Sequence, residues 1–282
     1  MIQDIAPHKL NNQYGQKKAP DAGSRFLYYD GRKVLVRKGI GGNENQIAYP
    51  TYEELKKCMP KEAAEDTEDT EYTYLFAVDD KSYYLGKKEN VGILSEQMGY
   101  EWIDHQEFRC VSPKYEAFAG ITGWQLARWY QDHKFCGRCG NVMKPDHVER
   151  MMQCPKCGLM EFPKICPAVI IGVIDGDRIL MSKYAGREYK KYALLAGFTE
   201  IGETLEETVS REVMEEVGLK VKNITYYKNQ PWAFSDTLLM GFFCELDGSD
   251  QVKLDENERS TQIRLMKVKD MMLEEAHHYK EK

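Results

Sequence analysis

The sequence lacks a long apolar run and any excess of basic charge. No stretch of about 18 apolar residues, the length that crosses a membrane as a helix, occurs in the 282 residues. The chain carries 39 Lys and Arg against 45 Asp and Glu, a net charge of -6, so no global attraction to nucleic acid or to an anionic membrane is expected. A polyanionic substrate would therefore need a local site, most simply one that contains metal.

Two further patterns are missing. Residues 1–16 show no basic segment followed by an apolar one, which predicts a cytoplasmic protein. The eight cysteines do not form a disulfide framework, because four of them make two CxxC pairs and the others are scattered singly. This pattern predicts a metal site in a reducing compartment.

The first 130 residues are predicted to form an α+β domain. The stretch "FLYYDGRKVLV", residues 26–36, has two β-favouring runs around Asp30 and Gly31 and predicts a hairpin. The stretches "YLFAVDD" and "KSYYLG" predict two more strands, and the acidic "KEAAEDTEDTEYTY" before them predicts an exposed loop. The domain is expected to end in a helix over residues 114–133.

The two CxxC pairs predict a zinc ribbon over residues 131–160. Fourteen residues separate Cys136 and Cys139 from Cys154 and Cys157, and each pair lets two thiolates converge on one ion. Four sulfurs close a tetrahedral site, so the zinc is expected to be structural. A redox dithiol would need only one pair, within a βαβ unit.

An acidic helix is predicted in the remaining region, residues 161–282, which also has a hairpin signal at "VIIGVIDGDRILMS". Residues 204–217 have an apolar residue at every fourth position and should be helical. Thr204 with Glu207 predicts a capping box, and Gly218 predicts the end of the helix. These features explain only part of the acidity.

The other carboxylates point to a metal. Glu212, Glu215 and Glu216 lie three and four residues apart and can reach a common point on one side of the helix. Carboxylates held that close repel one another, and a hard divalent cation reverses the sign of that interaction. A Mg²⁺ or Mn²⁺ site is therefore favoured over a solvated charged face.

Residues 197–219, "GFTEIGETLEETVSREVMEEVGL", resemble the box of the Nudix hydrolases at every specified position. The resemblance implies an α/β/α sandwich that hydrolyses a nucleoside diphosphate linked to another moiety. It also implies that Glu212, Glu215 and Glu216 are catalytic metal ligands. The catalytic base would be supplied by one of these carboxylates or by an arrangement of metal-bound water. Glu203 and Arg211 would hold the loop and orient the ligands.

Ten residues after the box stands "NQPWAF", residues 229–234. Taken alone, this aromatic pair favours core packing, but it resembles the Gln-Pro-Trp motif of the NADH pyrophosphatase branch, which also has a zinc ribbon. That branch implies cleavage of NAD(H) to NMN(H) and AMP, removal of NAD caps from RNA 5′ ends, and a homodimer. The branch implies that Phe162 and Phe198 sandwich the nicotinamide ring between them. The other substrate-binding positions it implies are Gln230, Pro231, Trp232, Phe234, Glu149 and Arg109.

The same branch adds the carbonyl of Ala196 and the carboxylate of Glu258 to the metal set. The chain departs from the branch at Ala233 and Ser235, where proline is usual. Two alternatives stay open: hydrolysis of another dinucleotide such as ADP-ribose, and a zinc-ribbon nucleic-acid-binding protein without catalysis. A local RNA track could come from the ribbon residues Lys144, His147, Arg150 and Lys156.

Overall fold

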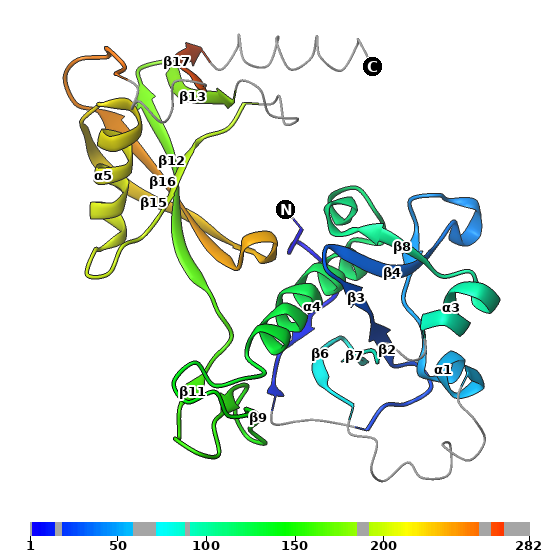
Figure 1. Cartoon of the computed structure of the whole chain (residues 1–282). Coiled ribbons are helices and arrows are strands. Elements are labelled where there is room, and N and C mark those ends of the chain that lie inside the picture. The colour runs from blue at the N-terminus through cyan, green and yellow to red at the C-terminus, as the bar shows by residue number, and fades with distance from the viewer. Residues whose placement is uncertain are drawn as a thin grey trace. The chain divides into compact units, whose positions relative to one another are not determined.

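The computed structural model describes residues 2–14, 19–58, 72–87, 91–184, 192–253 and 261–267. The chain divides into two compact units, residues 1–164 and 165–282, and each is described by itself (Figure 1). The predicted division at residues 130 and 160 stays a prediction. No described helix is long and apolar enough to span a membrane.

Unit 1 contains two four-stranded sheets with helices around them. The first has the order β1-β6-β7-β2: β1 (Leu10–Asn11), β6 (Tyr74–Val78), β7 (Lys81–Leu85) and β2 (Arg25–Leu27). The second has the order β3-β4-β5, with β8 also paired to β4: β3 (Tyr29–Asp30), β4 (Lys33–Lys38), β5 (Ile47–Ala48) and β8 (Glu101–Asp104). The helices are α1 (Tyr52–Cys58), α3 (Val91–Met98), α4 (Lys114–Asp132) and the short η2 (Ile40–Gly42) and η4 (His105–Arg109).

The predicted hairpin of residues 26–36 is only partly right. Asp30 pairs with Lys33 across a two-residue turn, and Gly31 has φ 56° there. The first β-favouring run is divided, however, because β2 leaves this sheet and pairs in parallel with β7. The strands β6 and β7 and the helix α4 are confirmed, whereas most of the predicted acidic loop lies outside the described residues.

Helix α4 packs very close to the β-strands of unit 1. A Cβ atom on Gly120 would stand 2.1 Å from the hydroxyl oxygen of Tyr49, and one on Gly123 would stand 2.4 Å from Leu27 Cδ1. The Tyr29 hydroxyl donates to the Gly120 carbonyl at 2.6 Å. Glycine at these positions lets the tyrosine hydroxyls reach the helix backbone, which fixes the helix that leads into the ribbon.

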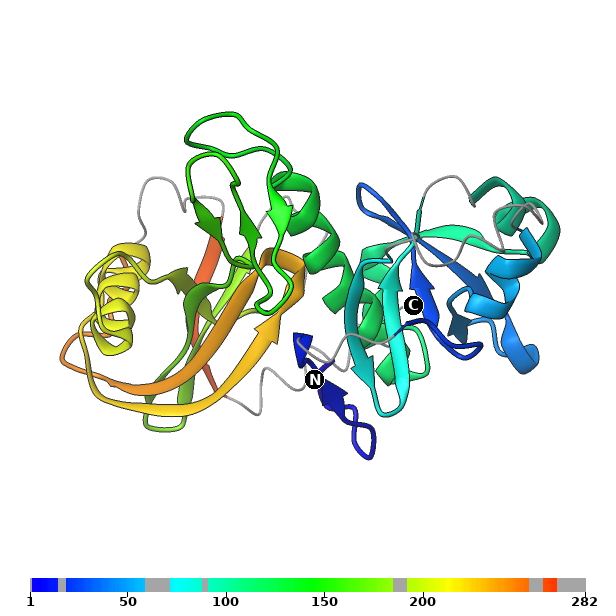
Figure 2. The same ribbon diagram turned by 90° about the horizontal axis from the view of Figure 1, so that it is seen from below.

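The ribbon follows α4 and has three short antiparallel strands in the order β11-β10-β9 (Figure 2). They are β9 (Lys144–Pro145), β10 (Met152–Gln153) and β11 (Met160–Glu161). A small apolar cluster of Met143, Met152 and Trp129, the last from α4, lies behind them. Because this core is so small, the folded ribbon needs a bound metal ion for its stability.

Unit 2 contains a six-stranded sheet in the order β15-β16-β12-β13-β17, with β14 also paired to β12. Its strands are β12 (Cys166–Asp175), β13 (Arg178–Tyr184), β14 (Leu195–Phe198), β15 (Val221–Trp232), β16 (Thr237–Leu246) and β17 (Thr261–Lys267). The β12–β16 pair is parallel and the other pairs are antiparallel. The predicted hairpin around Asp175 is confirmed, with Gly176 at φ 58° in a two-residue turn.

One α-helix, α5 (Leu205–Val217), lies among the described residues of unit 2, and the mixed α/β class predicted for this region is confirmed. Val209, Val213 and Val217 are fully buried against Val169 and Ile171 of β12, in one apolar cluster. Burying each valine contributes roughly 1.5–3 kcal/mol. The predicted apolar stripe therefore holds the acidic face of the helix outward.

Candidate active site and metal centre

The ends of helix α5 follow the sequence prediction. The Thr204 hydroxyl accepts from the Glu207 backbone N–H at 3.2 Å, and the Glu207 carboxylate accepts from the Thr204 backbone N–H at 2.8 Å. This is the predicted capping box. Gly218 closes the helix in the left-handed conformation at φ 67°. The acidic helix is thus set at both ends by local interactions.

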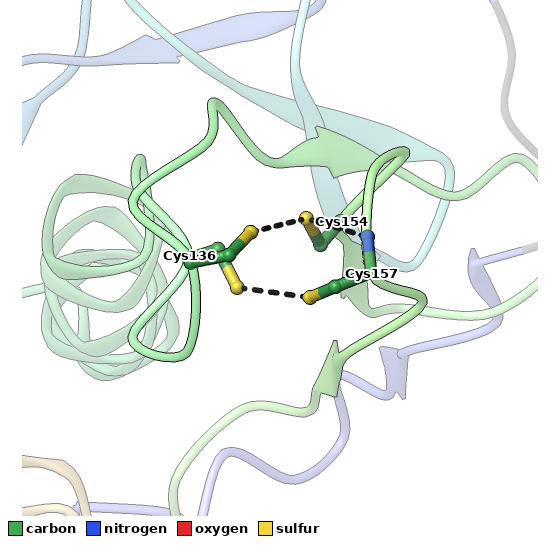
Figure 3. Close-up of side chains that lie close together, drawn as sticks. Cys136, Cys154 and Cys157 are labelled. Atoms are coloured by element: carbon green, nitrogen blue, oxygen red, sulfur yellow. Dashed lines mark hydrogen bonds between the residues drawn. The ribbon is translucent and has the colours of Figure 1, made fainter.

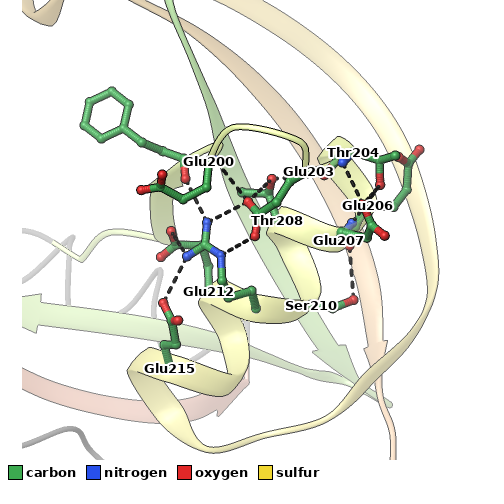
Figure 4. A network of polar contacts seen from close by, with 11 residues as sticks. Glu200, Glu203, Thr204, Glu206, Glu207, Thr208, Ser210, Glu212 and Glu215 are labelled. Carbon is green, nitrogen blue, oxygen red and sulfur yellow. Dashed lines mark hydrogen bonds and ion pairs between the residues drawn. The ribbon is translucent and has the colours of Figure 1, made fainter.

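Arg211 is the centre of a network that joins the helix to the loop before it (Figure 4). Its Nε donates to Glu203 at 2.5 Å, and its Nη1 donates to Glu212 at 2.8 Å and to Glu215 at 2.9 Å. Its Nη2 donates to the Phe198 carbonyl at 2.9 Å. One guanidinium therefore joins two of the three predicted metal ligands of the helix to Glu203 in the loop and to Phe198 at the end of β14.

Glu203 stabilises the turn of the same loop by hydrogen bonds. Its Oε2 accepts from the Glu200 backbone N–H and from the Thr208 hydroxyl, both at 3.0 Å. Hydrogen bonding from Arg211, with smaller contributions from these groups, lowers the pKa of Glu203 to about 2. Arg211 is correspondingly stabilised as a cation, and hydrogen bonding to Glu203 raises its pKa. The loop is held by an ion pair that stays charged far into the acid range.

Thr208 was not predicted from the sequence. It is fully buried, and its hydroxyl donates to Glu203 as well as lying 3.0 Å from the Thr204 carbonyl. The available signal was a polar residue beside the apolar stripe of the helix, next to Val209. Such a residue needs an internal partner, and here the partner is Glu203.

Glu212 lies against the strand that precedes the loop. A Cβ atom on Gly197 would stand 1.9 Å from the Glu212 carboxyl carbon, so any side chain there would displace this carboxylate. Gly197 follows Ala196 in β14, and the two residues pair with Val169 and Ile170 of β12. The side chain of Glu212 is 12% exposed. Its carboxylate therefore lies beside β14, the strand that contains Ala196, whose carbonyl is another predicted metal ligand.

The donor set of this region fits a hard divalent cation. Every predicted side-chain ligand is a carboxylate, the group that Mg²⁺ and Mn²⁺ favour, and Gly197 leaves room for one of them beside the backbone of β14. Glu215 is more than half exposed and Glu216 is half-buried on the same helix. Glu258 lies outside the described residues.

The predicted Gln-Pro-Trp motif occupies the end of β15 and the turn after it. Pro231 pairs with Leu238, and Gln230 pairs with Leu239 on β16. The rings of Trp232 and Phe234 lie 4.9 Å apart, the latter in the short helix η5 (Ala233–Ser235). Trp232 and Phe234 are therefore brought together at the hairpin tip, whereas their contact with substrate stays a prediction.

The other predicted substrate residues belong to both units. Phe198 ends β14 in unit 2 and is 53% exposed, while Phe162 follows β11 in unit 1 and is 55% exposed. Arg109 and Glu149 are exposed residues of unit 1. The proposed pairing of the two phenylalanine rings, and the roles of Arg109 and Glu149, stay predictions.

The four predicted zinc ligands meet in the ribbon. Among the described residues, Cys136, Cys139, Cys154 and Cys157 form a group whose sulfurs all lie within 4.8 Å of one another. Two of the Sγ–Sγ distances are 3.5 and 3.6 Å (Figure 3). Zinc–sulfur bonds of about 2.3 Å in a tetrahedron require a spacing of about 3.8 Å between sulfurs, so the sulfurs are arranged to hold zinc.

The electrostatics of the cysteine group agree with this arrangement. Burial alone would raise the pKa of the Cys154 thiol, but backbone N–H groups of Cys157 and Lys156 lower it to about 6. The pKa of Cys136 is lowered in the same manner, against the effect of burial, by the backbone N–H groups of Cys139 and Arg138. Zinc binds thiolates, and the turns of Cys136 and Cys154 favour the thiolate before any metal arrives. At Cys139 a backbone hydrogen bond from Asn141 acts in the same direction, but burial and the other three cysteines outweigh it and raise the pKa to about 11.

Comparison with known proteins agrees with these two centres. The NUDIX domain matches residues 164–282, and the NADH pyrophosphatase zinc ribbon domain matches residues 131–162. The NAD-capped RNA hydrolase NudC of Salmonella schwarzengrund (strain CVM19633) is 45% identical over 130 residues, which are 46% of this chain and 51% of that protein. The protein of the same name from Escherichia coli O9:H4 (strain HS) is 44% identical over 130 residues, with the same coverage of both chains.

The chain spans about half the length of the curated relatives it matches. Among solved structures, the NUDIX hydrolase from Nitrosomonas europaea is 25% identical, with a TM-score of 0.40 over 46% of this chain and 77% of that chain. Residues 164–282 are a Nudix domain, and residues 131–162 immediately before it are a zinc ribbon of the NADH pyrophosphatase type.

Proposed function

We propose that this chain is a metal-dependent hydrolase that cleaves the pyrophosphate bond of NAD(H), giving NMN(H) and AMP, and that the same reaction removes NAD caps from RNA 5′ ends. The observation that carries the proposal is the Arg211 network, which fixes Glu212 and Glu215 beside the loop of Phe198. Relatives named NAD-capped RNA hydrolase at 43–45% identity support the choice of substrate.

Glu212, Glu215 and Glu216, with the Ala196 carbonyl and Glu258, would hold Mg²⁺ or Mn²⁺. When bound, the ions would neutralise the diphosphate, position the attacking water and stabilise the displaced phosphate oxygen. The chain's own contribution is to orient two of these carboxylates, those of Glu212 and Glu215. Arg211 does so without occupying every oxygen, since it contacts Oε1 of Glu212 and Oε2 of Glu215.

Substrate choice would depend on aromatic residues. The Phe198 ring is exposed at the end of β14, and its backbone is fixed by Arg211, so it can stack on a flat base without first becoming ordered. Trp232 and Phe234 would line the same substrate from the hairpin tip, with Gln230 and Pro231. We further propose a homodimer, a cytoplasmic location, and an N-terminal domain that ends near residue 130.

A product analysis tests the proposal. The purified, zinc-loaded protein is incubated with Mg²⁺ or Mn²⁺ and, in parallel, with NADH, NAD, ADP-ribose and a short NAD-capped RNA, and the products are separated by chromatography. NMNH and AMP from NADH, or NMN and a 5′-monophosphate end from the capped RNA, support the proposal. Release of AMP from ADP-ribose alone would replace it with an ADP-ribose hydrolase.

A further inference from the structure

The hydroxyl of Thr208, on helix α5, lies beside the Arg211 network (Figure 4). Thr208 is fully buried, one turn after Thr204, the residue that caps the helix. Its single hydroxyl proton has two acceptors at 3.0 Å, which are the Oε2 atom of Glu203 and the backbone carbonyl of Thr204. The choice between these acceptors decides whether the side chain serves the helix or the network.

The carboxylate of Glu203 is the better of the two acceptors. The Thr204 carbonyl already accepts the backbone N–H of Thr208 at 3.0 Å, so it does not need the hydroxyl. Glu203 is ionised in its pair with Arg211, and a hydrogen bond to a charged acceptor is roughly twice as strong as one between neutral groups. The Thr208 hydroxyl therefore donates to Glu203. The exposed Ser210 differs, because its hydroxyl donates within the helix, to the carbonyl four residues before it at 3.1 Å.

Glu203 has hydrogen bonds to both of its carboxylate oxygens. Arg211 donates side-on, from Nε to Oε1 at 2.5 Å and from Nη2 to Oε2 at 2.9 Å. The Oε2 atom also accepts from the Glu200 backbone N–H and from the Thr208 hydroxyl, both at 3.0 Å. The Thr208 side chain is enclosed in the packed interior and cannot turn to water. Its hydroxyl thus ties the carboxylate of Glu203 to the buried side of the helix.

The guanidinium of Arg211 links Glu203 to the predicted metal ligands. Its five N–H groups make five hydrogen bonds, two to Glu203 and one each to Glu212, Glu215 and the Phe198 carbonyl. A guanidinium is planar and rigid. A shift of Glu203 therefore moves the group that also holds Glu212 and Glu215.

We propose that Thr208 is a positioning residue of the divalent-cation site: its hydroxyl holds Glu203, and through Glu203 and Arg211 it orients Glu212 and Glu215. The inference rests on the proposed function, because it takes the last two carboxylates as metal ligands. Valine has the shape of threonine without the hydroxyl, so it would fill the same buried space and leave this link open. The metal site needs the hydroxyl, whereas the packing of the helix does not.

Two substitutions at position 208 separate metal binding from stability. Thr208→Val keeps the buried volume and loses the hydroxyl, whereas Thr208→Ser keeps the hydroxyl and loses a buried methyl group. Binding of Mn²⁺ to the full-length, zinc-loaded protein is measured without substrate, from the electron paramagnetic resonance signal of free Mn²⁺. The Mn²⁺ that the parent binds and Glu212→Gln does not bind belongs to the site. Melting temperatures are measured in parallel.

The two variants should differ in opposite directions. Thr208→Val should bind Mn²⁺ about tenfold more weakly than the parent, at the lower end of the roughly 10- to 100-fold effects of groups that orient metal ligands. Thr208→Ser should bind Mn²⁺ within about twofold of the parent, although its melting temperature should be the lower of the two. With NADH at saturating Mn²⁺, Thr208→Val should lower kcat and leave KM nearly unchanged. The control Ser210→Ala should match the parent throughout.

A double variant tests the route through Glu203. Glu203→Ala leaves the Thr208 hydroxyl only the Thr204 carbonyl as an acceptor, so adding Thr208→Val to it should weaken Mn²⁺ binding no further. Residues that act through one chain of contacts have non-additive effects. Additive losses in the double variant would overturn the inference.

Three other results would also overturn it: Mn²⁺ affinities that follow the melting temperatures, unchanged Mn²⁺ affinity of Thr208→Val, or no site-specific Mn²⁺ binding by the parent. A different result would refute the proposed substrate alone. If the variants bind Mn²⁺ in the expected order and the parent forms no NMNH and AMP from NADH, the NAD(H) proposal fails and the role of Thr208 stands.

Discussion

The carboxylate of Glu212 lies against the backbone of Gly197, so close that a Cβ atom on the glycine would stand 1.9 Å from the carboxyl carbon. The glycine is needed here for space, because a side chain would occupy the place of the carboxylate. The first residue of the acidic motif and its first metal-ligand candidate thus form one structural unit, although fourteen residues separate them in the sequence.

Replacing Gly197 by alanine should displace Glu212 and lower turnover of NADH by roughly 100-fold, since misplacement of a catalytic group by about 1 Å has effects of that size. Because the contact is with the far end of a flexible side chain that can move aside, the free energy of unfolding should change much less than the activity. Gly92→Ala is the matched control, because nothing lies within 4 Å of a Cβ atom there. Full activity of Gly197→Ala would show that Glu212 need not stand beside β14.

Local features of the site could be predicted from the sequence. Thr204, Glu207 and Gly218 determine the ends of α5 through contacts over three or four residues, and the valine stripe determines its buried face. The cysteine spacing likewise predicted the ribbon, because each knuckle is a short-range turn. These predictions needed no knowledge of the tertiary structure.

Features that depend on distant pairing could not be predicted. The contact of Gly197 with Glu212 requires β14 and α5 to be packed, and the departure of β2 to a partner more than fifty residues away leaves no trace in its own sequence. Arg150 was interpreted as a candidate for RNA binding, and only the tertiary fold shows it bound to Leu75.

The Glu203–Arg211 pair should make a pH-dependent contribution to stability. The pKa of Glu203 is lowered from 4.5 to about 2 by Arg211, so the contribution is complete above about pH 4.5 and is lost as pH falls toward 2. The difference in unfolding free energy between the parent and Glu203→Gln should be constant from pH 7 to about 4.5 and then shrink. The zinc-binding cysteines titrate in both proteins, so their effect cancels and the difference in unfolding free energy reports on the Glu203–Arg211 pair alone. A difference that did not change with pH would refute the predicted contribution of the pair.

Cys136→Ser should release the zinc and destabilise the ribbon, because the metal replaces the core that the ribbon lacks. Metal analysis should show loss of zinc, and the free energy of unfolding should fall by more than about 3 kcal/mol. Cys110→Ser is the control, since Cys110 is an exposed cysteine outside the group. Unchanged zinc content and melting of Cys136→Ser would rule out the structural-zinc assignment.

Phe198→Ala should raise KM for NADH more than KM for ADP-ribose, because only NADH has a nicotinamide ring to stack. The expected increase for NADH is roughly two- to tenfold, from stacking of about 0.5–1.5 kcal/mol. Ile201→Ala is the control in the same loop, where the isoleucine side chain is fully exposed. Equal effects of Phe198→Ala on the two substrates would contradict stacking on the nicotinamide.

The central claim is that the acidic face of α5 cleaves NAD(H) with a divalent cation, and Glu216→Gln tests it most directly. The rate of NMNH and AMP formation from NADH is measured with and without Mg²⁺ or Mn²⁺, for the parent, Glu216→Gln and the control Glu206→Gln, an exposed residue in the first turn of the helix. We predict metal-dependent cleavage by the parent and the control, and a loss of about 100-fold or more for Glu216→Gln with unchanged melting. Undiminished cleavage by Glu216→Gln, or no NMNH from the parent with either metal, would contradict the claim.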